Sequence, residues 1–118
     1  MTVIDDLKKR LDDKTAVISL IGRRAMSGPN TYFAYEISYT APDMSGYETV
    51  YVTTDIEYGY GDHWLNMATE KFAELTGIAV DRAYLDRWGR ENGITVQASV
   101  EDVSSEAKLK AFIDDRTN

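Results

Sequence analysis

Residues 31–40 alternate between two kinds of side chain, and this alternation limits the possible folds more than any other feature of the sequence. One set is large and apolar or aromatic: Phe33, Tyr35, Ile37 and Tyr39. The other set is mostly smaller or polar: Tyr32, Ala34, Glu36 and Ser38. A period of two puts successive side chains on opposite faces of a β-strand. The segment therefore predicts a strand with one buried face.

A second alternating run, residues 47–56, follows a turn-forming segment. Two such runs joined by a turn are typical of an antiparallel hairpin. We expect Val50 and Val52 to enter the same core as Phe33. The opposite face would then expose five polar or aromatic side chains: Tyr32, Glu36, Tyr47, Tyr51 and Asp55.

Helix-start and helix-stop signals surround these strands. Thr2 and Asp5 resemble a capping box, which predicts a first helix to about Lys14. Asp62 can cap a helix that stops at Gly77. Four further segments have clear patterns: a strand over residues 15–21, a helix from Asp81 to about Arg90, a strand over residues 94–100 and a last helix capped by Ser104 or Ser105.

The resulting order is αβββααβα. It predicts one α+β domain over residues 1–118, with a mainly antiparallel sheet of three or four strands packed with helices. We expect one core, built from Phe33, Ile37, Val50, Val52, Leu65, Phe72, Leu75, Leu85, Leu109 and Phe112.

The composition fits an ordinary globular domain, since 43% of the 118 residues are hydrophobic and 28% are charged. The chain has no cysteine, which excludes disulfides, thiol catalysis and cysteine-ligated zinc. It has no long apolar stretch, and its first ten residues are rich in charge. We therefore expect neither a signal peptide nor a membrane span, and a cytoplasmic location.

The charge is concentrated in the middle of the chain. The net charge is −7, and no Lys or Arg occurs between Arg24 and Lys71. Residues 25–70 hold seven acids and seven of the eight tyrosines. A surface of one charge sign attracts the opposite sign and repels nucleic-acid phosphates. The segment therefore favours a basic partner.

The only histidine, His63, stands among acids and tyrosines, an array that could bind a metal or perform acid–base chemistry. Asp62 is already explained as a helix cap, however, and no second metal ligand follows at helical spacing. A small enzyme or metal site around His63 is therefore our second alternative, and we expect no metal and no cofactor.

Residues 68–90 resemble the helix-turn-helix motif of bacterial transcription regulators, because Ala73, Gly77 and Ile78 fall where that motif places small, turn and apolar residues. The resemblance implies a DNA-binding regulator, which is our first alternative. The second helix departs from the motif, since Asp81 and Asp86 accompany its arginines.

The αβββα order of the first part also resembles the topology of double-stranded-RNA-binding domains. Those domains hold phosphates with lysines at the start of the last helix. The corresponding helix here begins with Asp62, His63 and Trp64 and has no base before Lys71. We therefore expect no direct binding of nucleic acid through this face.

Our leading hypothesis is a non-enzymatic interaction module that binds a basic protein surface, such as that of a nucleic-acid-binding protein or complex. In composition the chain resembles small phage-encoded inhibitors, such as anti-CRISPR and nucleic-acid-mimicking proteins. Carboxylates on a rigid sheet can replace phosphates opposite Arg and Lys. The expected contact residues are Tyr32, Glu36, Tyr47, Tyr51, Asp55, Glu57, Tyr58, Tyr60 and Asp62.

Overall fold

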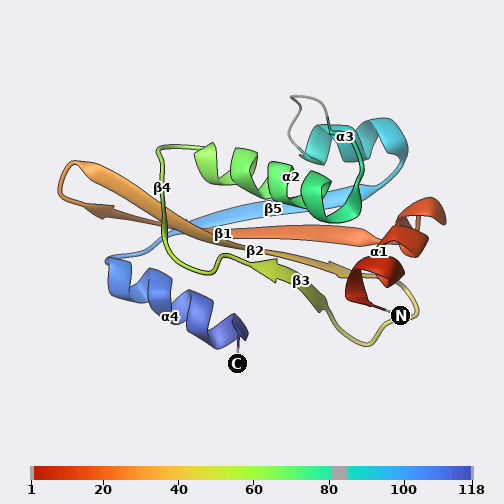
Figure 1. The fold of residues 1–118 in the computed structure, drawn as a ribbon, viewed down its shortest axis with the longest axis horizontal. Coiled ribbons are helices and arrows are strands. Elements are labelled where there is room, and N and C mark those ends of the chain that lie inside the picture. Colours follow the sequence, from red (N-terminus) through yellow and green to blue (C-terminus); the bar gives the residue numbers. More distant parts are fainter. Residues whose placement is uncertain (1, 81–84, 118) are drawn as a thin grey trace.

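The computed structural model describes residues 2–80 and 85–117 as an α+β fold with four helices and a five-stranded sheet (Figure 1). The elements, in order, are α1 (Val3–Asp12), β1 (Val17–Ser27), β2 (Asn30–Thr40), β3 (Glu48–Val52), β4 (Glu57–Tyr58), α2 (His63–Thr76), α3 (Leu85–Asn92), β5 (Thr95–Asp102) and α4 (Glu106–Thr117). The α+β class is as predicted. The order is αββββααβα, because the two-residue strand β4 was missing from the prediction.

The sheet is mixed and mostly antiparallel. Its main path is β3-β2-β1-β5. Strand β4 pairs with the edge of β2 that also pairs with β3, and it forms a separate short ladder there. β2 runs antiparallel to β1, β3 and β4, whereas β5 runs parallel to β1. The long hairpin of β1 and β2 is thus the centre of the sheet, and β5 forms one of its edges.

Helices cover both faces of the sheet, as Figure 1 shows with α2 and α3 above the strands and α4 below them. On the first face, Phe33 and Ile37 pack with Leu7 of α1, Phe72 of α2 and Leu85. On the second face, α4 contributes a smaller, separate cluster made of Leu109, Phe112 and Ile113 with Ala25, Ala34 and Val52. The prediction of one core is therefore wrong, and the sheet separates two.

The placement of Val52 in the second core has a local cause. The register of β2 and β3 shifts between Ile37 and Ser38, which is a β-bulge. A bulge adds one residue to one strand, so the side chains beyond it change faces relative to a regular alternation. Val50 accordingly packs against the Phe33 core, whereas Val52 packs on the side of α4.

The predicted helix ends are mostly confirmed. Thr2 and Asp5 form the expected capping box at α1, and Gly77 ends α2 in the left-handed conformation with a φ of 73°. Asp62 occupies the N-cap position of α2, but its side chain makes no capping hydrogen bond. The predicted cap Asp81 lies outside the described residues. Within the described part of the chain, no helix has the length and apolar character needed to cross a membrane.

Candidate functional site

Glu36 does not lie on an exposed face, which corrects the prediction from the alternating pattern. Its exposed fraction is only 8%, because α4 packs across this side of the sheet. The carboxylate accepts a hydrogen bond from Arg116 Nε at 3.1 Å and another from the Thr49 hydroxyl at 2.8 Å. The Arg116 guanidinium also lies 3.7 Å from the centre of the Phe112 ring. Glu36 is thus part of the packing of α4.

Tyr51 and Tyr32 are half-buried, and they lie on opposite faces of the sheet. Tyr51 packs beside Tyr35, with 5.9 Å between the ring centres, and the Lys71 ammonium lies 4.9 Å from its ring. Tyr32 packs against the α4 core. The prediction that both contribute to one exposed face is wrong, because the bulge in β3 moves Tyr51 to the side of α2.

Tyr47 is 67% exposed, as predicted, but it belongs to a different part of the surface. It lines a hollow together with Glu36, Ser38 and Gln97 of the neighbouring strands. The structure therefore separates Tyr47 from the tyrosines that follow β3.

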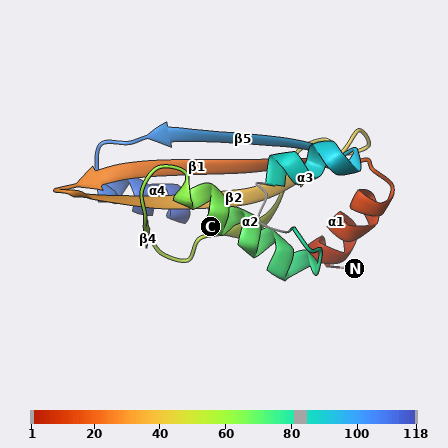
Figure 2. The same cartoon turned by 90° about the horizontal axis from the view of Figure 1, so that it is seen from above.

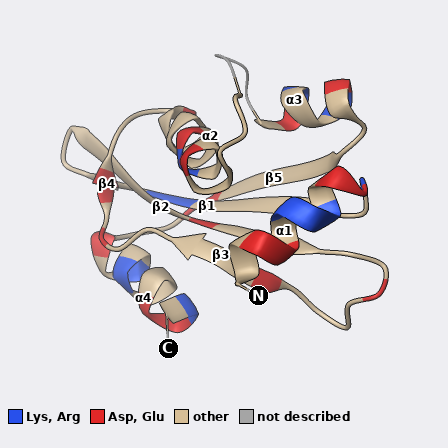
Figure 3. Cartoon of the chain, turned by 45° about the vertical axis from the view of Figure 1, so that its right-hand side comes forward, with Lys and Arg blue, Asp and Glu red and all other residues tan. Residues whose placement is uncertain are grey.

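The remaining five predicted residues form one exposed segment, residues 55–62, which we call the tyrosine loop. It contains β4 and joins β3 to α2, and its exposed members are Asp55, Glu57, Tyr58, Tyr60 and Asp62. Figure 3 shows acidic but no basic positions along the chain through β4. The exposed fractions of Tyr58 and Tyr60 are 53% and 55%.

Hydrogen bonds attach the tyrosine loop to the tip of the β1–β2 hairpin. The Tyr58 hydroxyl donates to the Tyr60 hydroxyl at 3.0 Å, and Tyr60 donates to the Pro29 carbonyl at 3.2 Å. The Gly59 amide donates to the Thr31 carbonyl at 3.0 Å. These connected hydrogen bonds fix the orientations of the Tyr58 and Tyr60 rings, which would otherwise be free on an exposed loop.

The aromatic rings of the loop also contact one another edge to face. The ring centres of Tyr58 and Tyr60 are 5.5 Å apart, and those of Tyr32 and Tyr58 are 5.6 Å apart. The hydrogen bond to Tyr60 raises the pKa of the Tyr58 phenol above its usual range, and partial desolvation adds to this effect. The Tyr58 hydroxyl is therefore neutral near pH 7 and available as a hydrogen-bonding group.

The acids of the loop have no ion-pair partner within the described residues. None of Asp55, Glu57 and Asp62 forms an ion pair with any base in residues 2–80 or 85–117. Arg24 lies beside the loop, but it donates to Asp102 and to the Gly61 carbonyl, each at 3.0 Å. The loop thus presents carboxylates whose charge is not neutralised by described neighbours.

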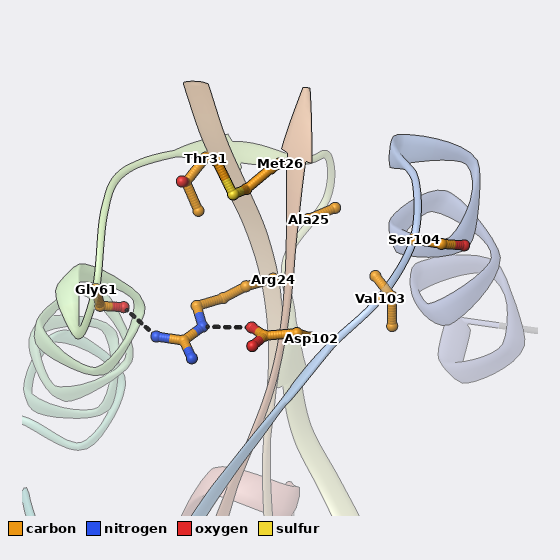
Figure 4. Close-up of a pocket in the computed structure, with 8 residues that line it drawn as sticks. All are labelled: Arg24, Ala25, Met26, Thr31, Gly61, Asp102, Val103 and Ser104. Carbon is orange, nitrogen blue, oxygen red and sulfur yellow. Dashed lines mark hydrogen bonds and ion pairs between the residues drawn. The ribbon is translucent and has the colours of Figure 1, made fainter. Parts of the chain in front are cut away.

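A hollow of about 410 Å³ adjoins the loop at Gly61 (Figure 4). Arg24 and Asp102 form its floor, and Met26 from the hairpin tip lines it with 70% of its surface exposed. Met26 is a contact candidate that our sequence reasoning missed. Its position directly before the turn residues Ser27 to Asn30 was the available signal, since hairpin tips are exposed.

His63 lies at the start of α2 with an exposed side chain, and its ring meets the Phe33 ring edge to face at 5.8 Å. Gly59 accommodates this ring, because a Cβ atom there would lie 2.4 Å from His63 Cδ2. Among the described residues, no three His, Asp or Glu side chains are grouped so that they could hold a metal ion.

Helices α2 and α3 lie in the described part of the helix-turn-helix alternative, but the two arginines of α3 are engaged. Within α3, Arg87 lies 3.6 Å from Glu91 and Arg90 lies 3.5 Å from Asp86. The hypothesis that residues 68–90 bind DNA stays a prediction, and part of that segment lies outside the described residues. Nothing in these ion pairs favours it.

Comparison of this chain with known protein families, with curated proteins and with solved structures gives no match. We therefore infer the function from the geometry of the tyrosine loop.

Proposed function

We propose that this protein is a non-enzymatic binding module whose tyrosine loop docks on a basic surface of another protein. A partner that normally binds nucleic acid fits best, as for inhibitors of the anti-CRISPR or nucleic-acid-mimic type. One observation carries the proposal: Tyr58 and Tyr60 are half exposed yet held by hydrogen bonds, beside three exposed carboxylates that have no ion-pair partner in the described residues.

Binding to such a surface would begin with electrostatic attraction, and contacts of the tyrosine rings would form after the encounter. Asp55, Glu57 and Asp62 would attract a basic surface and then accept paired hydrogen bonds from its arginines. Tyrosine rings provide a large contact area and cation–π partners at low entropic cost, and here the rings are already ordered. Preorganisation of this kind lowers the entropy lost on binding.

Charge neutralisation on the loop tests the electrostatic part. The loop variant Asp55→Asn/Glu57→Gln/Asp62→Asn would be compared with a control of equal charge change, Asp12→Asn/Asp114→Asn/Asp115→Asn, whose three acids are exposed elsewhere. The probe is an immobilised arginine-rich peptide, followed by any basic protein that the wild type retains from a host lysate. Association is measured at low and high salt.

We expect the loop variant to associate several-fold more slowly than the control at low salt, with a flatter salt dependence. An equal decrease of the association rate in both variants would mean that net charge alone attracts the probe. This result would overturn the role of the loop. Tight, salt-sensitive binding of random duplex DNA by the wild type would overturn the proposal in favour of the regulator.

A further inference from the structure

The edge strand β5 is exposed along most of its length, and α3 packs against its N-terminal half at Val96. It pairs with β1 on one side only, and in Figure 2 it runs along the upper margin with no described helix or strand outside it. Of its eight residues, only Val96 is partly buried. An unpaired edge offers a row of backbone donors and acceptors to any second strand.

The edge also lacks the usual features that discourage such pairing. Residues 95–100 contain neither a charged residue nor a proline, and two of them are valines. The ladder with β1 runs without a bulge from Thr95 to Asp102. Native proteins commonly protect exposed edges with lysine, proline or a bulge. β5 therefore has the regular geometry and composition of a strand that accepts a neighbour.

The charged side chains near the two ends of β5 are exposed, although they already have ion-pair partners within the chain: Glu101 and Asp102 pair with Arg23 and Arg24, and Arg90 pairs with Asp86. Glu101 and Asp102 stand at its C-terminal end, with 67% and 77% of their side chains exposed. At the other end, Lys14 donates to the Asn92 carbonyl, and Arg90 lines a hollow with Thr95 and Val96. An antiparallel neighbour of the same sequence would place the exposed Asp102 of each strand near the exposed Arg90 of the other.

We propose that a second copy of this chain pairs with β5 in antiparallel orientation, so that one sheet continues through both molecules. The two-fold axis passes at Ala98. Val96 then lies opposite Val100 of the second copy, and Gln97 lies opposite Ser99 of the second copy. In the same register Asp102 of the second copy approaches Ile94 and the nearby Arg90.

The geometry of antiparallel pairing selects this register. Side chains that lie opposite each other must share a face, so a two-fold axis must pass through a residue and not between two residues. Centring on Ala98 pairs valine with valine and brings Asp102 near the exposed Arg90 of the other copy. Centring on Ser99 would put Asp102 opposite Val96, which is less favourable.

Two double variants on exposed positions test the pairing and its register. Gln97→Lys/Ser99→Lys would place lysine opposite lysine twice, whereas Gln97→Lys/Ser99→Glu would place lysine opposite glutamate twice. Sedimentation velocity over a range of concentrations measures the dimer dissociation constant of each protein. Circular dichroism and thermal unfolding check that both variants fold.

We expect the wild type to dimerise reversibly and more weakly at high salt. The first variant should dimerise roughly tenfold more weakly, and the second at least as tightly as the wild type. In the wild type, amide hydrogen exchange of residues 95–102 should slow as the concentration rises, a result that needs no variant.

Several outcomes would overturn this proposal. One is a wild type that stays monomeric at about 1 mM, a concentration at which even a weak dimer would be populated. This result would overturn the proposal even if β5 bound an extended peptide from another protein. Another is equal dimerisation of the two double variants, which would place the contact elsewhere. The tyrosine loop is not part of this surface, so the two proposals fail independently.

Discussion

Two parts of the molecule use the same residue types for opposite purposes. Near α1, the hydroxyl of the buried Tyr39 donates to Asp6 at 2.6 Å, and Arg10 binds both Asp6 and Asp43. In the tyrosine loop, the exposed hydroxyl of Tyr58 donates to Tyr60, and the acids lack such a base among the described residues. The first arrangement joins elements of the fold, and the second leaves charge at the surface.

The difference comes from where the arginines lie in the sequence. Residues 25–70 contain no Lys or Arg, so each ion pair of an acid in this segment with Lys or Arg needs a partner from outside it. Arg10 of α1 reaches Asp43, and Arg116 of α4 reaches Glu36. An acidic segment of uniform appearance is thus divided by the fold into a paired part and an exposed part.

Removal of Arg116 should have the largest effect on stability. Arg116→Ala leaves Glu36 buried without its charge partner and also removes packing on Phe112. We expect a loss of about 3 kcal/mol in the free energy of unfolding. Urea denaturation measures it, with Lys110→Ala on an exposed position of the same helix as the control. Equal stability of the two variants would mean that Glu36 behaves like an exposed acid.

Removal of a loop tyrosine should affect binding and not folding. Tyr58→Ala should raise the dissociation rate of the partner complex by about tenfold, because aromatic anchors act after encounter. Tyr47→Ala provides the control, since Tyr47 is equally open but lies away from the loop. Surface plasmon resonance with the purified partner gives both rates. A larger effect at Tyr47 would move the binding surface to β3.

The stability of the paired part should depend on pH in the acid range. Hydrogen bonds from Tyr39 and Arg10 lower the pKa of Asp6, and the hydrogen bond from Arg10 lowers the pKa of Asp43. A lowered pKa means that the folded state favours the carboxylate. The stabilisation is therefore complete above about pH 5 and is lost as the pH falls through the folded pKa values.

Asp6→Asn and Asp43→Asn should each flatten this loss of stability between about pH 5 and pH 2. The loop variant Asp55→Asn/Glu57→Gln/Asp62→Asn should keep the wild-type slope. Urea unfolding at a series of pH values makes the comparison. Wild-type slopes in both aspartate variants would show that the acid sensitivity arises elsewhere.

The smallest effect concerns the loop acids and the stability of the fold. The same loop variant should change the free energy of unfolding at pH 7 by no more than about 0.5 kcal/mol, because exposed charges away from partners contribute little. Thermal unfolding measures this. A clearly larger loss would show that these acids stabilise the fold, which would weaken their assignment to binding.

Local patterns predicted much of the fold, for physical reasons that involve only neighbouring residues. The alternation in residues 31–40 placed Phe33 and Ile37 together on a buried face, because side chains of a strand alternate whatever it packs on. The opposite face was predicted to be exposed, but Ala34 and Glu36 on it are buried as well. The capping box at Thr2 and the stop at Gly77 were equally local. Strand β4 was not predicted, because two residues are too few to show an alternating pattern.

The candidate site was predicted in part. The sequence identified Tyr58 and Tyr60 among its contact residues, and the structure shows both on the surface. It misassigned Glu36, since the helix that covers this residue lies about 70 positions later in the chain. It also misassigned Tyr51, because a bulge depends on how two strands pair and leaves little trace in either strand alone.

The sequence by itself determined the α+β class, most helix ends and the confinement of the net charge to residues 25–70, because these follow from neighbouring residues and from simple counting. Only the tertiary structure decided that the sheet separates two cores, which acids meet an arginine, and that β5 is left as an open edge. Contacts between distant segments form when the whole chain packs, and no short stretch of sequence encodes them.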